Sequence, residues 1–263
     1  MPEGDFRILF VADVVGHPGR DAVKAILPGL KNELRPNLTV LNGENAAGGF
    51  GLTAKIVAEL KGAGADVITT GNHVFAQKEF VGELPNLQHV LRPANYPPQA
   101  PGQGWTVVSA VGHDVLVMNL MGRIFLDTLD DPFRAADSIL ASHPGARIVF
   151  VDMHAEATSE KTAMGWYLDG RVSAVVGTHT HIPTADARVL PGGTAYVTDV
   201  GMVGPRDSAI GMDKDVVIQR FLSGVPNRFV VASGPVTFNS VLVNIDSSSG
   251  RATSIQRIDR EHV

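Results

Sequence analysis

Short apolar runs recur along the chain, and each of them ends at a cluster of polar residues or at a glycine. The runs are unbroken and rich in valine and isoleucine, which is typical of strands that are buried on both faces of a sheet. The pattern therefore predicts a set of buried strands with polar residues at their ends. The predicted strands are 8–12, 38–41, 66–70, 148–151 and 172–176.

Helical patterns separate several of these runs, at 20–34, 53–61 and 132–141. Asp131 followed by Pro132 is a start signal for the third helix, since proline is favoured in the first helical turn. The alternation of strand and helix is the βαβ pattern of an α/β fold.

The pattern changes in two places. Residues 105–119 carry two strand-like runs on either side of a Gly-His-Asp turn, which predicts a hairpin. Residues 228–258 predict two or three antiparallel strands with turns at 233–235 and 247–250. No long linker or shift in composition accompanies these changes. We therefore predict a mixed second sheet within a single domain that spans residues 1–263.

Composition limits the chemistry. Hydrophobic residues make up 44% of the chain and charged residues 19%, as in an ordinary globular protein. The net charge of −5 gives no general attraction to nucleic acid, and we find no basic stripe with interleaved aromatic residues. There is no cysteine, so metal ligands would have to be His, Asp, Glu or Asn. Met1 to Asp5 is polar and no run of eighteen apolar residues follows, so we predict a cytoplasmic protein without a membrane span.

Polar residues at the ends of the predicted strands are the first candidates for a functional site, because sites in α/β sheets form at the carboxyl ends of strands. Four of the chain's nine histidines are among them. Imidazole, carboxylate and amide groups gathered in one place are what a bound cation requires. The candidates are Asp13, Glu44, Asn45, Asn72, His73, His154, His179 and His181.

Each candidate has an alternative explanation. His179 and His181 lie two residues apart in a loop, and in the alternative explanation they are ordinary hydrogen-bonded histidines instead of ligands. The segment of Glu44 and Asn45 would be a simple turn after Asn-Gly, although the glycines that follow suggest backbone close to a ligand. Asn72 would cap the next helix.

Three further alternatives concern His154, Asp13 and the segment that follows Asp13. His154 would be a buried histidine behind the ligands, with Asp152 and Glu156 as its orienting partners or as solvated loop charges. Asp13 would cap a helix, and the segment Gly16 to Arg20 would form a turn. The order of the motifs along the chain, rather than any one of them, favours metal binding.

That order resembles the calcineurin-like metallophosphoesterase superfamily. The closer resemblance, which covers most of the chain, is to the bacterial YmdB-type 2′,3′-cyclic-nucleotide phosphodiesterases. It is carried by Asp-Val-Val-Gly-His-Pro-Gly-Arg at 13–20, Asn-Gly-Glu-Asn-Ala-Ala-Gly-Gly at 42–49, Gly-Asn-His at 71–73, His-Ala-Glu-Ala-Thr-Ser-Glu-Lys at 154–161, Gly-Thr-His-Thr-His at 177–181 and Thr-Asp-Val-Gly-Met-Val-Gly-Pro at 198–205.

The resemblance implies a four-layer αββα sandwich of two mixed β-sheets flanked by helices, with a dinuclear centre of iron; manganese and zinc also suit such ligands. It implies that Asp13, Asn45 and His181 hold one ion, that Asn72, His154 and His179 hold the other, that Glu44 bridges them and that His73 donates a proton. The implied reaction is attack of a metal-activated water on the phosphorus of a 2′,3′-cyclic nucleotide. A homo-oligomer is compatible with this assignment.

The chain departs from the wider superfamily at two positions. Val15 stands where a histidine is usual, and Glu44 stands where an aspartate is usual; both changes are expected in the closer branch. We interpret His17 as a turn residue, and Arg20 as a solvated residue at a helix start rather than a substrate contact. Two other functions stay open: a phosphomonoesterase or nucleotidase with the same centre, and a regulatory protein whose metal site is structural.

Overall fold

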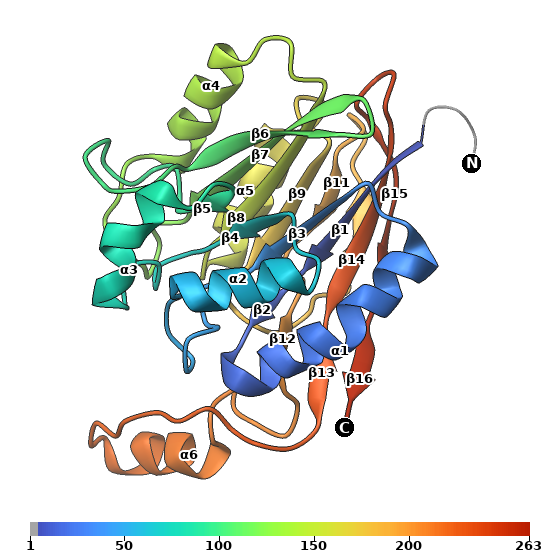
Figure 1. Cartoon of the computed structure of the whole chain (residues 1–263). Helices are drawn as coiled ribbons and strands as arrows, with labels where there is room; N and C mark the ends of the chain where they lie inside the picture. The colour runs from blue at the N-terminus through green and yellow to red at the C-terminus, as the bar shows by residue number, and fades with distance from the viewer. Residues whose placement is uncertain (1–4) are drawn as a thin grey trace.

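Two six-stranded mixed sheets form the centre of the molecule (Figure 1). The computed structural model describes residues 5–263. In the first sheet β1, β3, β4 and β5 are parallel, and β14 and β15 add antiparallel strands at one side. Its order is β15 (Ala252–Arg257), β14 (Ser240–Asp246), β1 (Asp5–Val11), β3 (Leu38–Asn42), β4 (Val67–Thr69) and β5 (Val90–Leu91).

The second sheet also has parallel strands in its middle, but it has antiparallel strands at both edges. The predicted hairpin at 105–119 is confirmed as β6 and β7, with the turn at Val111 and Gly112. The order is β10 (Arg188–Val189), β11 (Ala195–Val197), β9 (Ala174–Thr178), β8 (Ile148–His154), β7 (His113–Met121) and β6 (Trp105–Ala110).

Apolar side chains of both sheets form one core between them. Phe10 of β1 and Phe150 of β8 are fully buried there, with ring centroids 5.5 Å apart. Alternate residues of the same strands face outward and join two further cores under the helices. Both faces of each sheet are therefore buried, which is why the strands read as unbroken apolar runs.

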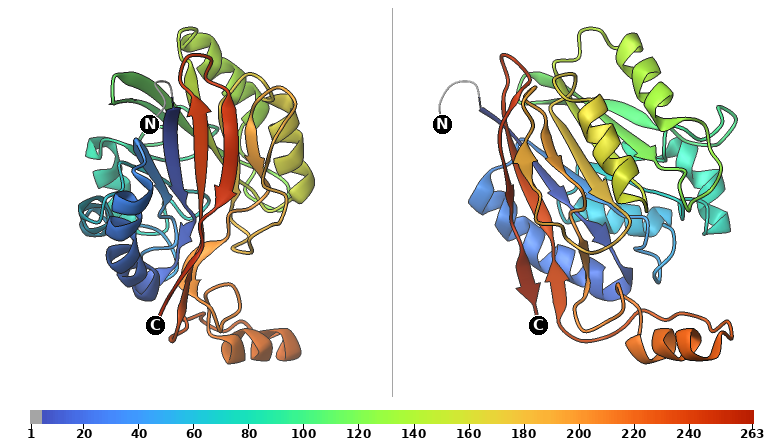
Figure 2. Two further views of the ribbon diagram at one scale, coloured as in Figure 1. Left: turned by 90° about the vertical axis from the view of Figure 1, so that its right-hand side faces the viewer. Right: turned by 180° about the vertical axis from the view of Figure 1, so that it is seen from behind.

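Helices cover the outer face of each sheet, and Figure 2 shows the resulting layers. The predicted four-layer αββα sandwich is confirmed. Helices α1 (Gly16–Leu34), α2 (Ala54–Gly62) and α3 (Lys78–Glu83) pack on the first sheet, followed by a short 3₁₀ turn (Leu84–Asn86). Helices α4 (Pro132–Ser142) and α5 (Thr158–Tyr167) pack on the second.

Helix α1 begins earlier than the prediction of 20–34. The segment from Gly16 to Arg20, for which a turn was an alternative, begins this helix instead. Pro18 is tolerated in the first helical turn because the backbone N–H groups have no helical partner there. Gly19 lets the helix approach the strand that contains Val203, since a Cβ at this position would lie 2.3 Å from the carbonyl oxygen of Val203.

A third sheet of four short strands extends the molecule beyond the two large ones. Its order is β16 (Arg260–His262), β13 (Val236–Phe238), β12 (Met202–Pro205) and β2 (Asp13–Val14). It was not predicted as a sheet, because its strands are two to four residues long and carry little pattern. Three strands, β13 to β15, lie within 228–258 as predicted, but they belong to two different sheets. Helix α6 (Lys214–Ser223) projects beyond the third sheet (Figure 1).

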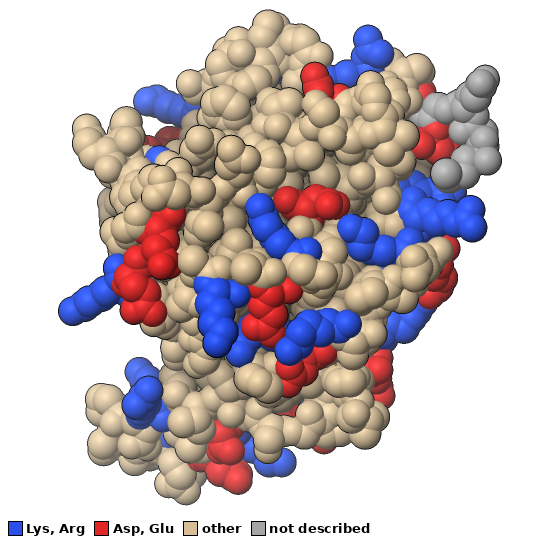
Figure 3. Space-filling model, viewed as in Figure 1, with Lys and Arg blue, Asp and Glu red and all other residues tan. Residues whose placement is uncertain are grey.

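The surface charges and the lengths of the helices concern two other predictions, those on nucleic-acid binding and on a membrane span. On the face shown in Figure 3, basic and acidic side chains are interspersed over α1 and α2. Within residues 5–263, no helix combines the length and the apolar character that a membrane crossing requires. The prediction from the polar N-terminus concerns residues 1–4 as well, and these lie outside the described residues.

We predict that the Phe10–Phe150 contact is a main source of stability. Phe150→Ala should lower the free energy of unfolding by about 3–5 kcal/mol, because it leaves a cavity between two rigid sheets. Urea unfolding of the metal-free protein measures this loss. Phe221→Ala is the matched control: Phe221 is 85% exposed, so its loss should stay within about 0.5 kcal/mol. Equal losses for the two variants would contradict the assigned core.

Candidate metal centre

All eight candidate residues lie where the carboxyl ends of strands from the two large sheets meet. Each lies at or just beyond an end of a strand, so the backbone rather than a long side chain determines its place. Asp13 starts β2 directly after β1, Glu44 and Asn45 follow β3, Asn72 and His73 follow β4, His154 ends β8, and His179 and His181 follow β9.

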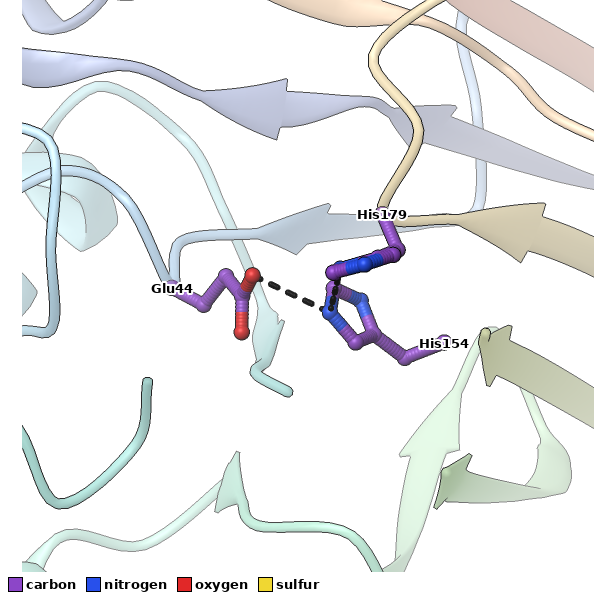
Figure 4. A group of neighbouring side chains, drawn as sticks. All are labelled: Glu44, His154 and His179. Carbon is purple, nitrogen blue, oxygen red and sulfur yellow. Dashed lines mark hydrogen bonds and ion pairs between the residues drawn. The ribbon is translucent and has the colours of Figure 1, made fainter. Parts of the chain in front are cut away.

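One group of ligand atoms surrounds the imidazole of His154. Its Nε2 lies 3.0 Å from Glu44 Oε1, 3.1 Å from Asn72 Oδ1 and 3.0 Å from His179 Nδ1. Figure 4 shows Glu44 and the rings of His154 and His179 pointing toward one another. Glu44, His154 and His179 can hold a metal ion together, since each offers a ligand atom at the same point.

Hydrogen bonds on the far side of His154 determine which ring nitrogen faces this point. The Thr178 hydroxyl donates to Asp152 Oδ1 at 2.7 Å, so it must accept from His154 Nδ1, which lies 2.9 Å away. A neutral His154 therefore carries its proton on Nδ1 and presents a lone pair at Nε2. This is the arrangement found behind metal-binding histidines.

The neighbouring ligands are oriented in the same way. His179 Nε2 lies 3.0 Å from Glu156 Oε2, which leaves the lone pair of Nδ1 toward His154. The Asn72 amide donates to His73 Nε2 at 3.3 Å and turns its oxygen toward His154. When His154 is neutral, four acceptor atoms thus converge without a donor among them, and a cation satisfies such a group.

A second group contains Asn45 and His181, and Asp13 lies beside the loop of His179, whose backbone N–H donates to Asp13 Oδ2 at 3.3 Å. Asn45 Oδ1 and His181 Nε2 lie 3.3 Å apart, and both are acceptors: the Asn45 amide donates to the Gly49 carbonyl at 3.0 Å, and His181 Nδ1 donates to the Ile210 carbonyl at 2.9 Å. Asp13 Oδ1 is buried and has no hydrogen-bond partner within residues 5–263. Such an orphaned carboxylate oxygen is costly to bury unless a cation binds it.

Burial and the neighbouring charges shift the pKa values of these groups. Burial raises the pKa of Asp13 well above its usual value. Burial alone would also raise the pKa of Glu44, but His154 outweighs it and lowers that pKa to about 2. Burial would lower the pKa of His154, but Glu44 raises it to about 9. Burial and the neighbouring His154 lower the pKa of His179 to about 3, and burial lowers that of His181.

The donor set fits a transition metal ion. Neutral imidazoles, carboxylates and amide oxygens in two adjacent groups suit iron, manganese or zinc. The helix-cap alternatives for two of these residues are wrong. Asn72 does not cap α3, whose N-cap is Gln77; Asp13 does not cap α1, whose N-cap is Val15. Glu44 does lie in a turn, as its alternative had it, but its side chain is 1% exposed and points into the site (Figure 4).

The loop of His179 and His181 needs support, because both residues have positive φ angles of 97° and 64°. A buried ion pair behind the loop supplies it: Lys161 Nζ lies 2.6 Å from Asp199 Oδ2. The same oxygen accepts from the backbone N–H of Thr180 at 3.1 Å and from its hydroxyl at 2.8 Å. The strained backbone is thus held at the residue that lies between the two histidines.

Several supporting residues were left open or missed by the sequence analysis. Asp152 orients His154 through Thr178, while Glu156 contacts His179 instead of His154. Thr178 is the last residue of β9, and its sequence context gave no signal of this relay. Gly71 was noted only as part of a motif, yet a Cβ there would lie 2.2 Å from His154 Nε2 and 2.3 Å from Glu44 Oε2.

Two residues of the first motif lie away from the ligands. His17 is exposed and pairs with Asp21 at 2.7 Å, and it belongs to α1 rather than to the predicted turn. Arg20 is not the solvated residue that was predicted: its side chain is 14% exposed, pairs with Glu59 at 3.2 Å and donates to the Ala46 carbonyl. It ties α1 to α2 and to the loop after β3.

We predict that Gly71→Ala weakens metal binding by at least about 10- to 100-fold, because the new methyl group must displace His154 or Glu44. Bound metal per folded chain, measured after dialysis, tests this. Gly82→Ala is the matched control. A Cβ at Gly82 meets no described atom within 4 Å, so metal binding should be unchanged. Full metal content in Gly71→Ala would contradict the assigned geometry.

Comparison with known proteins places the chain in a family. The model of the YmdB-like protein family matches residues 9–258. The chain is 54% identical, over 256 residues and 96% of both chains, to the 2′,3′-cyclic-nucleotide 2′-phosphodiesterase of Bacillus subtilis (strain 168).

Solved structures agree with this result. A hypothetical protein from Thermus thermophilus superposes with a TM-score of 0.93 at 44% identity, over 98% of this chain and 100% of the other. A phosphatase from Mycoplasma pneumoniae also reaches a TM-score of 0.93, at 33% identity, over 98% and 94% of the two chains. These relatives confirm the predicted phosphoesterase class. The chain belongs to the YmdB-like family of metallophosphoesterases.

Proposed function

We propose that the chain is a phosphodiesterase that hydrolyses 2′,3′-cyclic nucleotides, such as 2′,3′-cyclic AMP, at a centre of two metal ions. The observation that carries this proposal is the convergence of two adjacent groups of acceptor atoms on buried positions, with Glu44 and Asn45 next to each other in the chain. The name of the Bacillus subtilis relative supports the choice of substrate.

In this proposal each ion is held by one of the two groups. Asp13, Asn45 and His181 would bind the first ion, and Asn72, His154 and His179 the second. Glu44 would be shared, since it precedes Asn45 of the other group in the chain while its Oε1 lies 3.0 Å from His154 Nε2. Iron is our first choice of metal, with manganese and zinc compatible with the same donors.

The bound ions would polarise the phosphoryl oxygens and lower the pKa of the attacking water. The chain's own residues would orient the diester and complete the proton transfer. His73 lies at the pocket beside the ligands, and its ring packs edge-on against Phe50 with centroids 4.9 Å apart. With Asn72 bonded to its Nε2, the imidazole is fixed at a place from which it can protonate the leaving ribose oxygen.

A phosphomonoesterase with the same centre is the second candidate. The phosphatase from Mycoplasma pneumoniae, 33% identical to this chain, favours it. The ligand set suits both reactions, so the decision depends on substrates rather than on metal binding.

We predict that protein carrying about two metal ions cleaves 2′,3′-cyclic AMP in preference to 3′,5′-cyclic AMP and to a simple monoester, and that a chelator abolishes cleavage. Hydrolysis rates at a determined metal content test this. Glu44→Gln serves as a control that should lose both metal and activity. Faster cleavage of the monoester would favour the second candidate, and no cleavage at full metal loading would contradict both.

We predict that His73→Gln lowers turnover by about 10²- to 10⁴-fold while metal content stays near that of the unaltered protein, because a proton donor is lost and no ligand is. Turnover and metal content are measured on the same sample. Loss of the metal ions in this variant would mean that His73 is a ligand or a structural support instead.

A further inference from the structure

The pocket above the metal centre has one polar end and one apolar wall. Glu44, Asn45 and three histidines lie at the polar end, and the apolar wall comes mainly from α6 and the segments beside it. The pocket has a volume of about 350 Å³, which falls in the range of small-molecule sites. The residues of the wall used below are Ile210, Val217, Phe221 and Phe229.

Helix α6 contributes little to the core of the protein. None of its side chains is buried, and it projects from the body of the molecule (Figures 1 and 2). Ile218 is 50% exposed, Phe221 is 85% exposed and Leu222 is 76% exposed. Apolar surface that folding leaves in water is available to a ligand, which would gain the free energy of removing it from water.

The wall is attached directly to the metal centre. His181 Nδ1 donates to the carbonyl oxygen of Ile210 at 2.9 Å, so a metal ligand and the wall share a hydrogen bond. Behind Ile210, Met212 bridges to Val231, and the N–H of Asp213 donates to the Val230 carbonyl at 2.9 Å. These bonds hold the two ends of the α6 segment together beside the ligands.

Two aromatic rings of the wall are suited to a flat partner. Phe229 is half-buried, and the guanidinium of Arg220 lies 4.8 Å from its ring centroid, which restrains the ring. Phe221 lies on the same helix as Arg220 and lines the same pocket. Phe50 lines it from the loop after β3, where its ring already contacts His73.

We propose that this wall binds the base of the substrate nucleotide. The inference rests on the proposed function, since it assumes that the phosphate lies at the metal end of the pocket. The base would then extend toward Phe221 and Phe229. Aromatic rings bind bases through their faces and tolerate differences in base identity. The wall would therefore favour nucleotides over phosphodiesters without a base, and it would discriminate weakly among the bases.

The test compares 2′,3′-cyclic AMP with methyl β-ribofuranoside 2′,3′-cyclic phosphate, which keeps the cyclic diester and the sugar but has no base. Phe221→Ala and Phe229→Ala should each lower kcat/KM for 2′,3′-cyclic AMP by about tenfold, mainly through KM. For the compound without a base, the same variants should stay within about twofold of the unaltered protein.

Leu222→Ala is the matched control. Leu222 lies on the same helix and is exposed, but it does not line the pocket, so both substrates should be cleaved as by the unaltered protein. Sedimentation of each variant accompanies the kinetics. Equal losses for the two substrates would overturn the inference, and a simultaneous change in sedimentation would identify a second copy of the chain as the occupant of the wall.

Equilibrium binding separates this inference from the proposed function. Titration of the metal-loaded protein with adenosine 3′-phosphate and with ribose 3-phosphate requires no turnover. The nucleotide should bind about tenfold more tightly, and Phe229→Ala should remove the difference. If the protein cleaves neither cyclic diester but keeps this preference, the proposed function fails and the base-binding wall stands. Equal affinities for the two compounds would contradict base binding by the wall, whatever the kinetic result.

Discussion

The buried carboxylate of Asp152 joins the two large sheets at the edge where the site forms. It accepts hydrogen bonds from Asn42 at 3.0 Å and from Thr69, both on the first sheet. From the second sheet it accepts the Thr178 hydroxyl at 2.7 Å. Burial raises the pKa of this carboxyl, and His154 together with the three hydrogen-bond donors opposes that shift. Through Thr178 the same carboxylate orients His154, so the packing of the sheets and the direction of a ligand depend on one group.

The folded chain alone holds the candidate ligands in place. Both loop histidines have positive φ angles, and the Lys161–Asp199 ion pair with its bonds to Thr180 holds the backbone in that conformation. Orphaned acceptors and strained backbone both raise the free energy of the metal-free state. A cation that binds only the folded chain would satisfy these acceptors and would shift the folding equilibrium toward the native state.

The sequence predicted the ligand-bearing edge well, because a strand buried on both faces leaves a recognisable apolar run and its polar end is easy to see. The eight candidates at those ends do meet in the structure. The relay through Thr178 was not predictable, since a threonine at the end of a strand is ordinary. The short strands of the third sheet leave no pattern, and Phe221 and Phe229 lie far along the chain from the motifs. Their place at the pocket depends on the tertiary packing of α6 and of the residues that follow it.

Helix α6 is inserted between two strands of the third sheet, β12 and β13, and buries none of its own side chains. Substitutions on it consequently change the folding free energy little, whereas substitutions near Asp152 or Phe150 change it greatly. The part of the chain that lines the outer pocket can thus diverge among descendants without passing below the stability threshold that limits the rest of the protein. Such an arrangement separates the evolution of substrate range from the evolution of the catalytic framework.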